Sequence, residues 1–275
     1  MAHYDSITEI QKNIDYIEHV WKINYYHDPK TGRFTTKNGA GVSTAAGAGF
    51  KPASSVEEAK EFAKKELGFS MVDYSYSYID QKEMKQVSGR LDLDTINHIN
   101  GTIAEIQARY PELKGAVPNL QMSVHPSRFA ETLYSGRDGS MSLAIGARKY
   151  KDGVEAVDKA WKGDVEIGYH PAGTDGSAVL WHEYGHIYAS KVNLGSATSV
   201  RDKLMAVRDK KAETEWRKEA EKKLGLADGE LSAKISRYAA LGDDELFAEA
   251  FAAYNAGVTD NMVNAVMEAA GAGRR

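Results

Sequence analysis

Residues 182–186 read His-Glu-Tyr-Gly-His, and apolar residues flank them on both sides (Val-Leu-Trp before, Ile-Tyr after). Such flanks are typical of a half-buried helix. On a helix, residues four apart lie above one another on the same face, so His182 and His186 can reach one metal ion from the same side. Glu183 is rotated by about 100° from His182, so it can address a water molecule on that metal. The pattern therefore predicts two metal ligands and a general base.

The alternative interpretation is a core helix in which two histidines stand four residues apart by chance. Burying two histidines and a glutamate without a metal would leave polar groups that need partners, which is unfavourable. The chain has no cysteine, so histidines and carboxylates are the only plausible zinc ligands. We therefore predict one Zn2+ ion per chain, bound by His182 and His186. We also predict hydrolysis of peptide bonds, with Glu183 activating the metal-bound water.

A zinc ion held by two histidines needs a third protein ligand, and the C-terminal section offers candidates. Residues 243–254 are expected to form a helix, on which Glu245 and Glu249 lie four apart on one face. Their neighbours are mostly apolar, which indicates that both carboxylates are buried rather than on an exposed helix face. One carboxylate can complete the metal site, while the other accepts a hydrogen bond from the far nitrogen of a ligand histidine.

The pattern His-Glu-x-x-His, followed some 60 residues later by Glu-x-x-x-Glu, resembles the gluzincin branch of zinc metallopeptidases. The resemblance implies that Glu245 is the third ligand and that Glu249 is the partner of a ligand histidine. The run Glu-Leu-Phe-Ala-Glu-Ala-Phe (245–251) is also similar to the catalytic domain of anthrax lethal factor. There a tyrosine seven residues before the ligand glutamate lies over the metal, and Tyr238 matches it. The resemblance implies that Tyr238 donates to the oxyanion formed during hydrolysis; the alternative is a tyrosine that only packs.

A broader resemblance, over most of residues 27–255, is to the zincin-like domains of phage head-morphogenesis and minor head proteins. It is carried by four stretches: HDPKTGRFTTKNG (27–39), ELGF (66–69), RYPELKG (109–115) and SRYAA with ELFAEAFAAY (236–254). The large head-morphogenesis domain of those proteins has no counterpart in this sequence. The resemblance implies a free-standing zincin-like domain with an N-terminal arm.

The periodicity of the chain predicts an α+β fold, mainly helical, with a small mixed or antiparallel sheet and an N-terminal helix plus flexible arm. Three parts are expected: the helix at 1–26, a Gly-rich arm at 27–52 and a zincin-like domain at 53–275. Besides the metal helix, helices are expected at 54–67, 93–110, 199–224, 243–254 and 259–270. Strands are expected at 120–124, 141–146 and 164–169, and less regularly at 71–78.

Residues 164–169 alternate between polar and apolar residues and come just before the metal helix, so they are the expected substrate-binding sheet edge. Val165, Ile167 and Tyr169 would contact an extended peptide there. His170 precedes a proline in a turn and is interpreted as a loop residue or substrate contact rather than a ligand. His98 and His125 lack the spacing of metal ligands and are interpreted as structural.

Composition and charge limit the partners. The net charge of −4 does not favour nucleic acid, no apolar stretch is long enough to cross a membrane, and the first residues do not resemble a signal peptide. We therefore expect a cytoplasmic location, in a host cell or virion if the protein is viral, and a protein or peptide substrate. The N-terminal helix could dock on a partner, such as a phage head or capsid protein, or on its own domain. The alternatives to a zinc endopeptidase are a virion structural protein that keeps the fold and a toxin-like effector protease.

Overall fold

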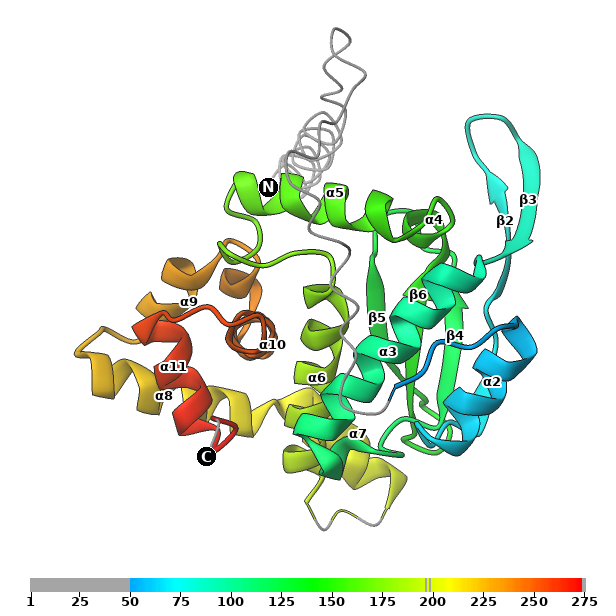
Figure 1. The fold of residues 1–275 in the computed structure, drawn as a ribbon. Coiled ribbons are helices and arrows are strands. Elements are labelled where there is room, and N and C mark those ends of the chain that lie inside the picture. The colour runs from blue at the N-terminus through cyan, green and yellow to red at the C-terminus, as the bar shows by residue number, and fades with distance from the viewer. Residues whose placement is uncertain (1–49, 196, 198, 274–275) are drawn as a thin grey trace, which may run out of the picture. The chain divides into compact units, whose positions relative to one another are not determined.

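The computed structural model of this protein describes residues 50–195, 197 and 199–273. The predicted N-terminal helix (1–26) and all but the last three residues of the predicted arm (27–52) lie outside this part of the chain. The predicted division of the chain at residue 53 therefore stays a prediction. Figure 1 shows the arrangement of the elements.

The main sheet has four strands in the order β1-β4-β6-β5. Three strands are parallel, β1 (Met71–Val72), β4 (Asn119–Ser123) and β6 (Met141–Gly146), while β5 (Ala130–Tyr134) runs antiparallel to β6. The strands expected at 120–124 and 141–146 are confirmed. The small mixed sheet among many helices confirms the predicted α+β class. Strand β5 forms one edge of this sheet.

A separate antiparallel hairpin, β2 (Ser75–Asp80) and β3 (Lys85–Arg90), projects beyond the main sheet (Figure 1). The irregular strand expected at 71–78 is thus two strands that belong to different sheets. They part at Tyr74, whose buried hydroxyl donates to Asn100 at 2.6 Å. The sequence did not predict β3 because its residues are nearly all exposed, so they show no alternation between apolar and polar side chains.

The helices fall into an N-terminal and a C-terminal group. The first comprises α2 (Val56–Lys65), α3 (Leu93–Arg109), the short η1 (Pro111–Leu113), α4 (Ala147–Tyr150) and α5 (Val154–Glu166). The second comprises α6 (Ala178–Leu194), α7 (Val200–Asp209), α8 (Lys211–Leu224), α9 (Glu230–Ile235), η2 (Ala239–Leu241), α10 (Asp243–Asn255) and α11 (Asn261–Ala269). The single helix expected at 199–224 is two helices, because Lys210 adopts a left-handed conformation with φ of 47°.

The strand expected at 164–169 is wrong, because helix α5 continues through this region to Glu166. Val157, Trp161 and Val165 are spaced four apart, and this helical spacing places all three against the core. The local alternation of residues 164–169 is too short to override a helix that is already packed. Residues 164–169 therefore form no sheet edge, and the edge strand that lies beside α6 is β5.

Helix α6 runs between the main sheet and the C-terminal helices and packs closely on α10 (Figure 1). Gly185 is at the crossing: a Cβ atom built on it would lie 2.8 Å from the Cα of Ala248 and 3.2 Å from the Cβ of Phe251. The backbones can approach this closely only because both residues at the contact, Gly185 and Ala248, are small. This close crossing brings the histidines of α6 next to the glutamates of α10.

Gly185→Ala should therefore destabilise the protein although alanine is the better helix former. The added methyl group must push α10 away, and overpacking of this kind costs about 1–3 kcal/mol in the free energy of unfolding. The matched control is Gly163→Ala on α5, where an added Cβ meets nothing within 4 Å. That change should be neutral or stabilising, by up to about 1 kcal/mol. Urea unfolding of both variants measures the difference, and equal stabilities would contradict the tight crossing.

Candidate metal centre

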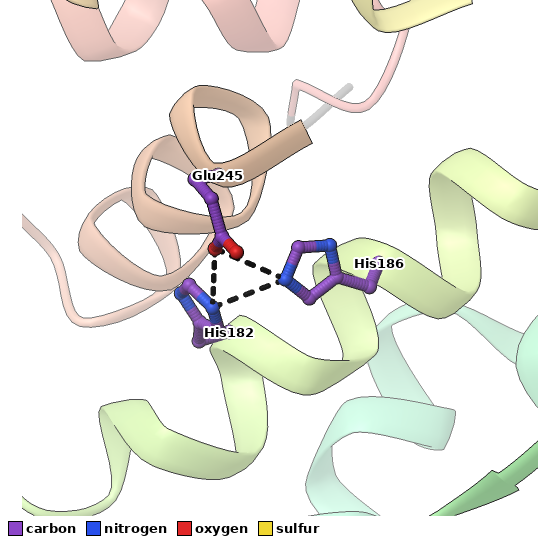
Figure 2. Close-up of side chains that lie close together, drawn as sticks. All are labelled: His182, His186 and Glu245. Atoms are coloured by element: carbon purple, nitrogen blue, oxygen red, sulfur yellow. Dashed lines mark hydrogen bonds and ion pairs between the residues drawn. The ribbon is translucent and has the colours of Figure 1, made fainter. Parts of the chain in front are cut away.

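Three side chains from two helices converge at the crossing of α6 and α10 (Figure 2). The Nε2 atoms of His182 and His186 are 3.1 Å apart. Glu245 Oε2 lies 3.2 Å from the first and 3.3 Å from the second. The three donor atoms thus form a nearly equilateral triangle, although Glu245 is 59 residues from His186 in the chain.

The triangle has the size that a tetrahedral metal ion requires. Donor atoms about 2.0–2.1 Å from a tetrahedral zinc ion are about 3.3 Å from one another. Glu245 Oε2 is also a buried oxygen without an aligned hydrogen-bond donor among the described residues. A buried carboxylate oxygen in this state is unfavourable unless a cation occupies the space it faces. His182, His186 and Glu245 therefore form a candidate metal-binding triad.

The electrostatics of the triad also favour a positive charge at its centre. Burial opposes the charged form of His182, but the carboxylates of Glu245 and Glu249 outweigh it and raise its pKa well above the usual value. Burial likewise opposes charge on Glu245, yet the two histidines beside its carboxylate hold its pKa below the usual range. The group of residues attracts a cation, and a metal ion that binds there displaces protons from the ligands.

Glu249 lies one helical turn after Glu245 and is fully buried, with 0% of its surface exposed. Its Oε1 lies 2.8 Å from Nδ1 of His182, the nitrogen on the far side of the ring from the triad. Glu249 thus contacts a histidine of the candidate triad and is not itself part of the triad. Its other contacts are to His170 and Ser236.

Glu183 follows His182 on α6 and is buried on the side facing the sheet. Its Oε2 accepts a hydrogen bond from Thr132 Oγ1 at 2.8 Å, and the same hydroxyl lies 3.3 Å from the backbone oxygen of Glu183. Thr132 belongs to β5, a strand that the sequence did not predict. No signal in the sequence links Thr132 to the motif, because their contact depends on the packing of β5 against α6.

Tyr238 lies just before η2, and its half-buried ring is 5.5 Å from the ring of His182. Burial, reinforced by the charge of Glu245, raises the pKa of Tyr238, so its phenol stays protonated and able to donate. Backbone bonds of 3.0 Å from Arg237 to Gly168 and from Tyr238 to Tyr169 hold this segment in place. The structure thus brings Tyr238 close to the triad.

The three residues expected to bind substrate do not form the edge that the sequence suggested. Val165 lies in α5 and packs on the core, and Ile167 ends that helix on the exposed surface. Tyr169 lies in the following loop, where its ring is 5.2 Å from that of Tyr238. Only Tyr169 is therefore near the triad, and it is there as part of a loop.

His170 lies in the loop between α5 and α6 and outside the triad, as the sequence predicted, but it is buried and lies against Glu249. The two remaining described histidines lie outside the triad. His98 is on α3, where burial lowers its pKa, and His125 is an exposed turn residue that contacts Ser127.

No family model, no curated protein and no solved structure matches this chain. The gluzincin and phage-protein resemblances therefore stay expectations, and the function has to be argued from the site itself. Within residues 50–195, 197 and 199–273, none of the helices is both long and apolar enough to cross a membrane.

Proposed function

We propose that this protein is a zinc-dependent endopeptidase in which Glu183 is the general base. One observation carries the proposal: the donor atoms of His182, His186 and Glu245 form a triangle with edges of 3.1–3.3 Å, and Glu183 lies on the same helix as the two histidines. Two histidines with a carboxylate are a donor set that catalytic zinc uses, with a fourth position left for water or substrate. Zinc bound there would act as a Lewis acid toward a water molecule and a substrate carbonyl.

The chain's own residues would then move the protons. Glu183 has one carboxylate oxygen occupied by Thr132, which leaves Oε1 to accept a proton from the attacking water. The same carboxylate delivers that proton to the leaving amine. The phenol of Tyr238 donates a hydrogen bond to the carbonyl oxygen as negative charge develops on it.

The edge strand β5 is the part of the sheet that an extended peptide would use. It is the last strand of the main sheet, it lies beside α6, and it carries the residue that holds Glu183. An extended peptide that pairs with a sheet edge gains backbone hydrogen bonds whatever its side chains are. A substrate paired with β5 would therefore pass close to Glu183, which places the scissile carbonyl near the base.

The test combines metal analysis with digestion by the wild-type protein. We expect about one zinc ion per chain and cleavage within a broad peptide library. A chain without metal would refute the proposal at its centre. A chain that binds zinc and cleaves nothing in the library would instead support the virion structural role, in which the fold is kept without proteolysis.

Thr132→Val should lower the peptidase rate without affecting zinc content. Valine has the shape of threonine and cannot donate to Glu183, and hydrogen bonds to charged groups contribute about 1.5–3 kcal/mol. We expect kcat to fall about 10- to 100-fold with little change in KM. Thr132→Ser keeps the hydroxyl and should restore most of the rate.

The control for Thr132→Val is Tyr134→Phe. The hydroxyl of Tyr134 contacts Ser190, so this change removes another polar contact between β5 and α6 without touching Glu183. If Tyr134→Phe lowers kcat as much as Thr132→Val, the effect comes from the packing of β5 on α6 and not from the hydrogen bond to Glu183.

A further inference from the structure

A third histidine, His170, contacts the carboxylate that lies behind the metal triad. Its Nδ1 is 3.1 Å from both Oε1 and Oε2 of Glu249. His170 is 6% exposed and Glu249 is 0% exposed, so water does not solvate this carboxylate. A carboxylate buried in this way is stabilised by the donors that the protein supplies. Since Nδ1 of His170 faces two acceptor oxygens, we assign its proton to that nitrogen.

The Glu249 carboxylate has two further partners, and together they use both of its oxygens. Oε1 lies 2.8 Å from Nδ1 of His182 in an ion-pair contact that is not aligned as a hydrogen bond, and Oε2 accepts a hydrogen bond from Ser236 Oγ at 3.0 Å. With Nδ1 of His182 turned to Glu249, its Nε2 is the nitrogen that faces Glu245 and His186. The Glu249 carboxylate thus lies against the ring of His182 on the side away from the other two triad residues.

Aromatic packing holds the ring of His170 in place. It is stacked on Trp161, with ring centroids 3.7 Å apart and an angle of 9° between the planes. Trp161 Nε1 donates to Thr174 Oγ1 at 2.9 Å, and that hydroxyl donates to the backbone oxygen of Pro171 at 2.8 Å. Trp161 is a buried residue of α5. A helix that carries none of the triad residues thus fixes His170.

We propose that His170 is a positioning residue for the metal centre. It holds Glu249 in the orientation that aims Nε2 of His182 at the ion. The proposal rests on the zinc site proposed above but not on peptide hydrolysis, because the quantity it concerns is metal affinity. Trp161 of α5 packs on His170, His170 contacts Glu249, and Glu249 contacts His182 of α6.

Two substitutions separate the hydrogen bond from the ring packing. His170→Phe keeps an aromatic ring on Trp161 and removes the donor to Glu249. His170→Asn removes the ring and keeps a donor, since Nδ2 of asparagine stands close to where Nδ1 of histidine does. We expect His170→Phe to weaken zinc binding about 10- to 100-fold, as loss of support for a ligand histidine does in other zinc sites. We expect His170→Asn to bind zinc nearly as tightly as the wild type.

Zinc affinity is measured at fixed pH by competition with a chromophoric chelator, on full-length variants whose folding is checked by circular dichroism. Wild-type affinity in His170→Phe overturns the proposal. So does an affinity in His170→Asn as weak as that in His170→Phe, since ring packing would then be the cause. If His170→Phe does not fold, 15N NMR of the wild-type histidines tests the proposal by determining the tautomer of His170. We expect the Nδ1–H tautomer, and the Nε2–H tautomer would overturn the proposal.

The outcomes separate this proposal from the proposed function. Zinc binding by the wild type with unchanged affinity in His170→Phe overturns only the role of His170. If the wild type binds zinc and His170→Phe loses zinc affinity as expected, but the wild type cleaves no peptide, only the proposed peptidase activity is overturned. A wild-type chain that binds no zinc overturns both.

Discussion

Glu183→Gln should abolish peptide hydrolysis while leaving the zinc ion bound. Glutamine has nearly the shape of glutamate, and its amide oxygen can still accept the hydrogen bond from Thr132. It cannot take a proton from water, however, so the general base is lost. General-base catalysis contributes about 10²- to 10⁴-fold in rate, and we expect a loss in that range. Because Glu183 is not part of the triad, the metal content should stay at the wild-type value.

The measurement pairs elemental analysis of zinc with initial rates on a peptide that the wild type cleaves. A matched control is Glu215→Gln, which makes the same chemical change at an exposed position on α8, where the residue pairs only with Lys211 among the described residues. The control should keep both full activity and zinc. A Glu183→Gln protein that retains more than a tenth of the wild-type rate would remove Glu183 from the mechanism.

Of the variants Glu245→Ala and Glu249→Ala, the first should bind zinc more weakly, whereas the second should have the less stable metal-free fold. Glu245 supplies a donor atom of the triad, so its loss should weaken zinc binding most. Glu249 only supports His182, so its loss should weaken binding about 10- to 100-fold. For the metal-free fold the order reverses. Removing Glu249 leaves the buried donors of His170 and Ser236 unsatisfied, at about 1–3 kcal/mol for each such group.

Both rankings are accessible in one set of samples. Zinc affinity is measured by chelator competition, and stability is measured by thermal unfolding in excess chelator. Glu245→Ala should show the weaker affinity and the higher melting temperature of the two. If Glu249→Ala instead loses zinc more severely, the two roles are exchanged. Equal melting temperatures would mean that the hydrogen bonds around Glu249 contribute little to the metal-free fold.

Regular spacing made several elements predictable. The isoleucines of α3 recur every three or four residues, and the helix expected there is confirmed to within a residue. Strand β6 is confirmed with the expected bounds. By contrast, residues 164–169 alternate like a strand, but they include the end of a helix whose spacing begins at Val157. Where a strand-like and a helical spacing overlap, the segment adopts the structure of the element that already packs on the core. A few residues of sequence do not show which element that is.

The residues of a single helix were the part of the candidate site that the sequence alone determined. His182 and His186 are four apart, so the geometry of α6 puts their nitrogens side by side without help from the rest of the fold. The two carboxylates of α10 have the same spacing and were singled out for the same reason. The roles predicted for them depended on the resemblance to known peptidases, because spacing alone does not say which of the two would face a metal.

The tertiary structure decided how these elements meet. The close crossing of α6 and α10 at Gly185 brings Glu245 Oε2 to 3.3 Å from His186, and the packing of β5 and α5 adds Thr132 and His170. These contacts join residues between 51 and 79 positions apart, so no local pattern records them. Spacing along a helix fixes the directions of neighbouring side chains, whereas contacts between elements depend on how their surfaces fit together. The motif therefore predicted two residues of a candidate metal site, and the packing around α6 determined which other residues lie beside them.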